Sequence, residues 1–264
     1  MDFSESQIQR YSRHIILNEI GPEGQEKLLK SKVLVVGAGG LGSPVLLYLA
    51  AAGIGTIGII DFDNVDITNL QRQVIHSTPK VGTPKVFSAK ERINELNPDV
   101  NVIIYQHKFT AENALDIIKD YDMVVEATDN YSSKFLVNDA CVIGGKSFSQ
   151  GGVLRFEGQT FTYVPGCACY RCLYNAPPPT GQDPSCAQAG ILGSIAGMLG
   201  TIQATEVLKY LVGKGELLTN RLLTFDALKM NFRTLKFEPD PACPACGNVD
   251  MTIILRDVET SCSI

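Results

Sequence analysis

The sequence predicts an α/β fold in which a Rossmann-like, mostly parallel sheet continues into antiparallel strands. Three observations support this prediction. Short apolar runs alternate with segments of helical periodicity between residues 32 and 143. A glycine-rich turn, residues 37–42, directly follows the first apolar run, as in nucleotide-binding βαβ units. From residue 146 the pattern changes to short apolar segments that are typical of antiparallel strands.

Two helices are expected before the sheet. Ser4 and Gln7 have the spacing of a capping box, and apolar residues at helical spacing continue this helix over residues 7–18. A second, short helix is expected over residues 22–30. We therefore assign residues 1–30 to an N-terminal helical segment.

Residues 31–145 are expected to form a nucleotide-binding half. Ligands of open α/β sheets bind at the carboxyl ends of the strands, so the loops that follow the strands are the candidate site. Pro98 ends one of the helices because proline disfavours helix in the residue before it. Strands are expected at 32–36, 57–60, 101–105 and 122–127, and helices from the glycine turn to about 52 and at 84–96, 111–119 and 131–143.

Residues 146–250 are expected to form the second half. A proline-rich stretch excludes regular structure, and we expect a mobile surface loop over residues 174–186. A turn at Glu157 and Gly158 is expected to join the first two strands. The strands are expected at 147–154, 159–163, 221–226 and 231–237. Residues 251–264 are expected to form a disordered C-terminal tail.

An apolar segment, residues 187–212, raises the question of a membrane span. It contains Gly193 and Gly197 at a spacing used by membrane helix dimers. Polar residues such as Gln203 and Glu206 interrupt it, and small residues also permit close helix packing inside a soluble core. We expect a buried helix, with a position at a subunit interface left open.

Composition excludes several classes of function. The 264 residues are 45% hydrophobic and 19% charged, enough for a substantial core. The net charge of −5 and the lack of a Lys/Arg run argue against nucleic-acid partners and anionic membrane surfaces. The first residues do not resemble a secretory signal. Eight cysteines then indicate a reducing compartment, and we expect a cytoplasmic protein.

The glycine turn is a candidate phosphate-binding site. Its glycines, Gly37, Gly39, Gly40 and Gly42, follow a strand and precede a helix. Asp61 lies about 20 residues further on, at a strand end where a carboxylate can bind a ribose hydroxyl. Taken alone, these features favour NAD, with ATP second.

Three further residues change this preference to Mg·ATP. Arg72 and Lys85 supply cations that a triphosphate needs while pyrophosphate leaves. Asp129 follows the strand at 122–127, where a carboxylate can hold the Mg²⁺ that bridges ATP phosphates. Helix caps and solvated surface are the ordinary alternatives for single residues, but they do not explain the whole set at neighbouring strand ends.

Two Cys-x-x-Cys pairs form a candidate metal site. Cys169 with Cys172 and Cys243 with Cys246 match a structural, four-thiolate zinc site. Redox pairs are the alternative, but neither pair clearly opens a helix. Cys167 is an additional thiol and the alternative to Cys169, but the Cys-x-x-Cys spacing favours Cys169.

These motifs together resemble the ThiF/MoeB/HesA family, relatives of the ubiquitin-activating enzymes. The resemblance extends from about residue 11 to residue 247. It implies ATP-dependent adenylation of the C-terminal glycine carboxylate of a small ubiquitin-like sulfur carrier of the MoaD/ThiS type, which ends in Gly-Gly. The segments that support the resemblance are Gly37–Gly42, Asp61–Asp63, Asn69–Gln73, Thr83–Lys85, Ala127–Asn130 and both cysteine pairs.

The resemblance also implies roles for individual residues. Arg72 and Lys85 would contact phosphates, and Asp129 would hold Mg²⁺. Arg13 resembles an arginine finger that enters the active site from the other subunit of a homodimer. The nucleotide-contacting set is expected to be Gly37, Gly39, Gly40, Gly42, Asp61, Asp63, Asn69, Arg72, Gln73, Lys85 and Asp129. The catalytic set is expected to be Arg13, Arg72, Lys85 and Asp129, with Cys186 as an open case.

Several alternatives stay open at this stage. Cys186 matches a loop cysteine that forms a covalent link to the carrier in some family members and is dispensable in others. A relative that activates a small molecule or a modified tRNA base is the closest competing function, followed by an NAD-dependent oxidoreductase and a non-catalytic scaffold. Because no sulfurtransferase domain follows Cys246, we expect a separate sulfur donor. Molybdopterin, thiamine, cysteine and tRNA-thiolation pathways are not distinguished.

Overall fold

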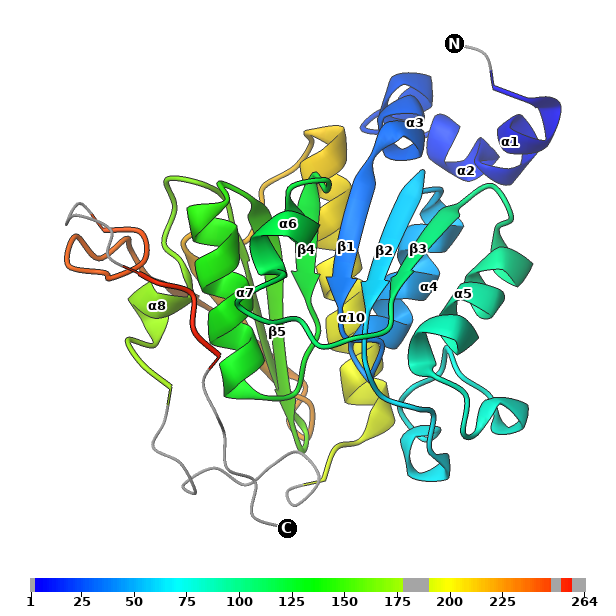
Figure 1. The fold of residues 1–264 in the computed structure, drawn as a ribbon. Helices are drawn as coiled ribbons and strands as arrows, with labels where there is room; N and C mark the ends of the chain where they lie inside the picture. The colour runs from blue at the N-terminus through cyan, green and yellow to red at the C-terminus, as the bar shows by residue number, and fades with distance from the viewer. Residues whose placement is uncertain (1–2, 178–189, 248–252, 258–264) are drawn as a thin grey trace.

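A computed structural model describes residues 3–177, 190–247 and 253–257. One eight-stranded sheet runs through the described part of the chain (Figure 1). The strands are β1 (Lys32–Val36), β2 (Thr56–Ile60), β3 (Asn101–Tyr105), β4 (Met123–Glu126), β5 (Ser147–Leu154), β6 (Glu157–Tyr163), β7 (Arg221–Asp226) and β8 (Asn231–Lys236). Their order is β3-β2-β1-β4-β5-β6-β7-β8. The first five are mutually parallel and the last three continue the sheet antiparallel, as the sequence predicts.

Helices cover both faces of the sheet. In the described residues they are α1 (Glu5–Arg10), α2 (Ser12–Ile15), α3 (Gly21–Lys30), α4 (Gly42–Ala52), α5 (Lys85–Leu96), α6 (Ala114–Ile118), α7 (Tyr131–Ile143), α8 (Tyr170–Leu173) and α10 (Gly193–Val212), with short 3₁₀ helices η1 (Ile67–Asn69) and η2 (Thr78–Lys80). In Figure 1, α6 and α7 lie in front of the sheet, and α4 and α10 lie behind it.

The alternation of side chains along β1 divides the core between the two faces. Val33 and Val35 pack with α4, α5 and α10, whereas Leu34 and Val36 pack with α6 and α7. All four are buried, which explains why the strand is continuously apolar, as strands covered on both faces are. β4 and β5 lie on opposite sides of residue 145 and pair directly in the same sheet. The sheet therefore marks no boundary there, and the division of the chain at residue 145 stays a prediction.

The N-terminal helix is interrupted at Tyr11, in contrast to the continuous helix predicted over residues 7–18. The capping box of Ser4 and Gln7 is present, but α1 ends at Arg10 and α2 is a separate short helix. Tyr11 is buried, and its hydroxyl oxygen accepts a hydrogen bond of 2.9 Å from Asn97 Nδ2. Burial of this ring against the end of α5 explains the break.

The turn between β5 and β6 is two residues earlier than predicted. It lies at Arg155 and Phe156, and Arg155 has a positive φ of 55°. Gly158 instead belongs to β6, opposite Val153. A Cβ there would lie 2.3 Å from the ring of Phe225 on β7, so this glycine makes room for an aromatic side chain.

The apolar segment before residue 212 forms a buried helix, as expected. Within the described ranges, no helix combines the length and apolarity needed to cross a bilayer. α10 packs against α4, and a Cβ at Gly200 would lie 2.4 Å from Pro44 Cγ. The small residues of α10 therefore permit close helix packing. The helix begins at Gly193, later than the predicted segment, because residues 190–192 are described and are not helical. Residues 187–189 lie outside the described residues.

Candidate active site

The glycine turn folds tightly on itself between β1 and α4. Gly37 has a φ of +100°, and a Cβ there would lie 2.7 Å from the carbonyl oxygen of Ala127. A Cβ at Gly42 would lie 1.9 Å from the carbonyl oxygen of Gly37. At Gly39 the nearest atom would be Gln73 Nε2, at 3.6 Å, so the backbone at Gly39 is less crowded. Gly37 and Gly42 build the turn, and Gly39 leaves room for a ligand near the start of α4.

Asp61, directly after β2, is hydrogen-bonded to this turn. Its Oδ2 accepts from the Ala38 amide at 2.8 Å, and its Oδ1 accepts from the Asp63 amide at 2.9 Å. Burial raises the pKa of Asp61, while the charge of Lys85 and the two amide donors act in the opposite direction. The carboxylate thus holds the turn in place in addition to lying where a ribose ligand is expected.

His76 binds the carbonyl group of the same residue, Ala38, a role that the sequence interpretation missed. Its Nε2 lies 3.0 Å from the Ala38 carbonyl oxygen, and its Nδ1 lies 2.9 Å from Ser88 Oγ. Because a carbonyl only accepts, Nε2 must be the protonated nitrogen, and Nδ1 accepts from Ser88. Burial lowers the pKa of His76 to about 4, so the ring is neutral near pH 7.

The two predicted cations lie around the turn. A Cβ at Gly40 would lie 3.5 Å from Arg72 Cγ, so the Arg72 side chain runs beside Gly40. Lys85 is buried, and its Nζ donates to Asp63 Oδ2 at 2.8 Å. Both side chains therefore belong to the same end of the sheet as the glycine turn.

The remaining members of the Asn69–Gln73 motif have different environments. The Oδ1 of Asn69 accepts from the Asp66 amide at 3.2 Å, so this side chain stabilises the local 3₁₀ turn. Gln73 is buried, and its Oε1 has no hydrogen-bond partner among the described residues. A buried amide oxygen without a partner is costly, which is consistent with a ligand contact beside Gly39.

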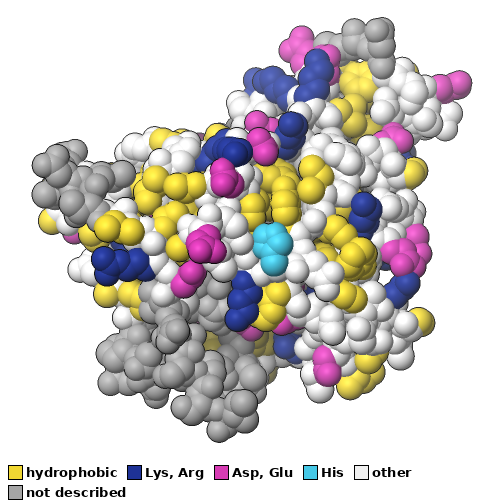
Figure 2. Space-filling model, viewed as in Figure 1, with side chains coloured by type: hydrophobic (Ala, Val, Ile, Leu, Met, Phe, Trp, Pro, Cys, Tyr) yellow, Lys and Arg dark blue, Asp and Glu magenta, His cyan; other side chains and the backbone are white. Residues whose placement is uncertain are grey.

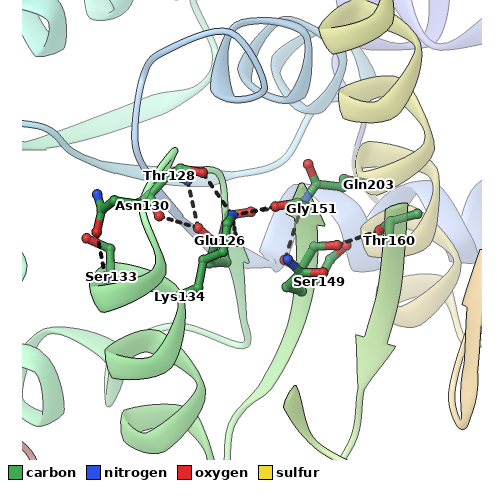
Figure 3. Close-up of polar contacts among 10 residues, drawn as sticks. Glu126, Thr128, Asn130, Ser133, Lys134, Ser149, Gly151, Thr160 and Gln203 are labelled. Carbon is green, nitrogen blue, oxygen red and sulfur yellow. Dashed lines mark hydrogen bonds and ion pairs between the residues drawn. The ribbon is translucent and has the colours of Figure 1, made fainter. Parts of the chain in front are cut away.

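Asp129 is exposed just beyond the end of β4, the strand next to β1. Its segment packs on the glycine turn, since a Cβ at Gly37 would lie 3.5 Å from the Thr128 amide nitrogen. Below Asp129, a buried network of Glu126, Lys134 and neighbouring groups joins β4 to α7 and β5 (Figure 3). The sequence interpretation did not identify this network.

Arg13 is not brought to the turn within one chain. It is exposed on α2, and the neighbouring Tyr11 packs on Gly53, immediately after the last residue of α4. The glycine turn is at the other end of α4, whose 11 residues span about 16 Å. Figure 1 shows α2 at the top of the molecule and the segment after β2 at the bottom. Within one chain these two predicted site components are therefore separated.

The four predicted zinc ligands form one cluster. The Sγ atoms of Cys169 and Cys243 are 3.6 Å apart, those of Cys172 and Cys246 are 3.3 Å apart, and all four lie within 4.8 Å of one another. Burial raises the pKa of the Cys169 thiol, a cost that a cation would reverse by stabilising the thiolate. Four converging thiols fit tetrahedral zinc, with Cys167 outside the cluster.

The structure does not test two predictions, the role of Cys186 and the absence of a nucleic-acid partner. Cys186 lies outside the described residues, as does most of the predicted loop and of the C-terminal tail. On the face shown in Figure 2, basic and acidic side chains are intermingled, without an extended patch of one sign among the side chains described there. The expectation that nucleic acid is not a partner stays a prediction.

Comparison with known proteins gives a consistent family assignment. The ThiF family matches residues 11–245. The chain is 44% identical to the sulfur carrier protein adenylyltransferase of Thermus thermophilus, with 100% of both chains covered. It is 46% identical to the SAMP-activating enzyme E1 of Haloferax volcanii, covering 100% of this chain and 98% of that protein.

The solved structures agree with these sequence relatives. The structure of E. coli MccB with AMPCPP and MccA has a TM-score of 0.81 and 25% identity, covering 94% of this chain and 76% of that one. The likeness extends over the parallel and antiparallel parts of the sheet, since it covers nearly the whole chain. The sequence motifs, the sheet order and these relatives agree, and the chain belongs to the ThiF family.

Proposed function

We propose that this chain is an adenylyltransferase that uses ATP to activate the C-terminal carboxylate of a small ubiquitin-like sulfur-carrier protein. The observation that supports it most is the grouping of Arg72 and Lys85 around the glycine turn at the carboxyl ends of the parallel strands. Relatives that match over the whole chain are named for activation of a sulfur carrier or of SAMP.

The proposed chemistry needs charge stabilisation more than proton transfer. A carrier carboxylate is already ionised near pH 7, so it can attack the α-phosphorus of ATP without a general base. One carboxylate oxygen bonds to phosphorus while the bond to the pyrophosphate oxygen breaks and that oxygen keeps the electron pair. Arg72 and Lys85 would stabilise the charge on the phosphates, and the glycine turn would let the phosphates approach its backbone closely.

The described residues also fit ATP and Mg²⁺. The open backbone at Gly39 and the buried, unpartnered Oε1 of Gln73 both point to a polar ligand at the turn. In this proposal Asp61 and Asp63 line the ribose side, and Asp129 holds Mg²⁺, which neutralises phosphate charge when it is bound. An NAD-dependent oxidoreductase is less consistent with the site, because a dinucleotide does not need both Arg72 and Lys85.

The proposal includes a homodimer and a zinc ion. Because Arg13 lies at the far end of α4 from the turn in its own chain, a second copy would have to supply it as an arginine finger. Zn²⁺ would be held by Cys169, Cys172, Cys243 and Cys246 and would join α8 to the C-terminal segment. With four protein ligands this site would be structural, and the sulfur donor would be a separate protein.

The proposal is tested by ATP–pyrophosphate exchange with candidate carriers that end in Gly-Gly. Exchange is expected with at least one intact carrier and not with the same carrier lacking its last glycine. A thermal shift is expected with Mg·ATP and not with NAD(H). If Mg·ATP binds but no carrier supports exchange, the carrier function is wrong, and small molecules or modified tRNA bases become the candidates to test.

A further inference from the structure

A buried ion pair lies beneath the strand end that bears Asp129. Glu126, the last residue of β4, is 0% exposed, and Lys134 on α7 is 8% exposed. The Lys134 Nζ donates to Glu126 Oε2 at 2.8 Å, to the Thr128 carbonyl oxygen at 2.9 Å and to the Gly151 carbonyl oxygen at 2.6 Å (Figure 3). All three ammonium hydrogens therefore have acceptors, which are drawn from β4, from the loop after it and from β5.

The pair holds the peptide groups on both sides of Thr128. Glu126 Oε1 accepts from the Thr128 amide at 2.7 Å and also from its hydroxyl group, while Lys134 donates to the Thr128 carbonyl oxygen. Thr128 has left the sheet ladder, so its backbone groups need such partners. The next residue is Asp129, and Asn130 then caps α7 by accepting from the Ser133 amide at 2.8 Å. Asp129 thus lies between two fixed residues.

Further contacts connect this network to the rest of the site. Gln203 on α10 donates from Nε2 to the Glu126 carbonyl oxygen at 2.9 Å and to the Ser149 carbonyl oxygen at 3.3 Å. A Cβ at Gly151 would lie 2.6 Å from Gln203 Oε1, so a side chain there would displace the Gln203 amide. On the other side, the segment of Thr128 packs on Gly37. The glycine turn and Asp129 are therefore held at a fixed separation.

We infer that Lys134, acting with Glu126, is a positioning residue that sets Asp129 relative to the glycine turn for the binding of Mg·ATP. This inference rests on the proposed function, in which Asp129 holds Mg²⁺. Folding stability alone does not require the pair, because apolar residues of similar volume often replace a buried ion pair without loss of stability. Apolar residues would leave the Thr128 amide without its carboxylate acceptor and the Thr128 carbonyl without its ammonium donor.

Three variants and one control test the inference. Lys134→Met removes the ammonium group, Glu126→Gln/Lys134→Met removes both charges, and Lys134→Arg keeps a charged donor. Val137→Ala is the control, because it truncates a fully buried side chain on α7 away from Asp129. Thermal unfolding identifies the temperature at which all four variants are folded, and binding is measured there.

The readout is the Mg²⁺ concentration that gives half-maximal ATP binding, which requires no carrier. We expect Lys134→Met and the double variant to raise it by about 10–100-fold, as for other groups that orient metal ligands. Lys134→Arg is expected to restore most of the affinity, and Val137→Ala to leave it unchanged. A rise for Val137→Ala as large as that for Lys134→Met would contradict positioning and indicate a general loss of stability.

The specific link to Asp129 is tested in an Asp129→Asn background. There Lys134→Met is expected to cause no further rise in the Mg²⁺ requirement, since the ligand it positions is already lost. An equal rise in both backgrounds would overturn the inference. In parallel, ATP–pyrophosphate exchange by the native chain with carrier tests the proposed function. If exchange fails while the coupling to Asp129 persists, the carrier function is wrong and the positioning role stands.

Discussion

Replacing His76 by glutamine is expected to reduce the pH dependence of folding stability. His76 is 7% exposed, and both ring nitrogens have hydrogen-bond partners. Burial lowers the pKa of His76 from 6.5 to about 4, the charge of Lys85 acts in the same direction, and the hydrogen bond to Ala38 acts against it. Glutamine does not titrate, and its amide can still donate to the Ala38 carbonyl oxygen.

The sign of the effect follows from proton uptake. As pH falls, the unfolded chain takes up a proton on His76 near pH 6.5, whereas the folded chain does so only near pH 4. His76 therefore causes no loss of stability above pH 6.5. As pH falls from 6.5 toward 4, its protonation in the unfolded chain lowers the free energy of unfolding. At pH 5 the loss from this residue amounts to about 2 kcal/mol.

The measurement is urea unfolding of the native chain and His76→Gln at pH 7 and pH 5, monitored by circular dichroism. Between these pH values the native chain is expected to lose about 2 kcal/mol more stability than the variant. Protonation of the cysteine cluster affects both proteins, so it cancels in the comparison. The same pH dependence in both proteins would refute the conclusion that His76 is buried and neutral beneath the turn.

Three further predictions concern the turn, the cysteine cluster and the dimer. Gly42→Ala is expected to abolish ATP binding in calorimetry, because the new Cβ would lie 1.9 Å from the carbonyl oxygen of Gly37. The control Gly152→Ala, whose Cβ would have its nearest neighbour at 3.5 Å, is expected to bind ATP normally, and equal binding by both variants would contradict the assigned role of the turn. Cys172→Ser is expected to lower both the zinc content by metal analysis and the melting temperature, and an unchanged zinc content would exclude Cys172 as a ligand. Arg13→Ala and Asp129→Ala are each expected to be inactive, yet a mixture that exchanges subunits should recover about a quarter of the native exchange rate; no recovery would contradict an arginine supplied by the partner.

The sheet and the glycine turn could be predicted because their signals are local in the sequence. Strand 101–105 and helix 131–143 have the predicted bounds, since apolar periodicity and flanking polar residues define them within a few positions. The glycine turn was identified for the same reason. Its crowding confirms that Gly37 and Gly42 are needed as glycines.

The differences arise from contacts between residues far apart in the chain. Gly158 suggested a turn, but its role is to make room for Phe225 on another strand. The break at Tyr11 depends on Asn97, and the role of His76 depends on Ala38. None of these pairs has a fixed spacing that a sequence pattern can show.

A usable signal existed for the Glu126–Lys134 pair. Glu126 lies within the predicted strand 122–127, one residue before its end, and a buried carboxylate requires a cationic or hydrogen-bonding partner. Lys134 lies on the following helix, close enough in sequence to be the candidate. The burial of both residues confirms that this rule would have found them.

The central claim is that a carrier carboxylate attacks the α-phosphorus of ATP at this site. The most direct measurement uses a Gly-Gly carrier with ¹⁸O in its C-terminal carboxylate, followed by release of the acyl group to a nucleophile and analysis of the phosphorus products by ³¹P NMR. The account predicts AMP and pyrophosphate, with ¹⁸O in the phosphate of AMP and a product yield that falls to background in Asp129→Ala. Formation of ADP with ¹⁸O in inorganic phosphate would contradict it.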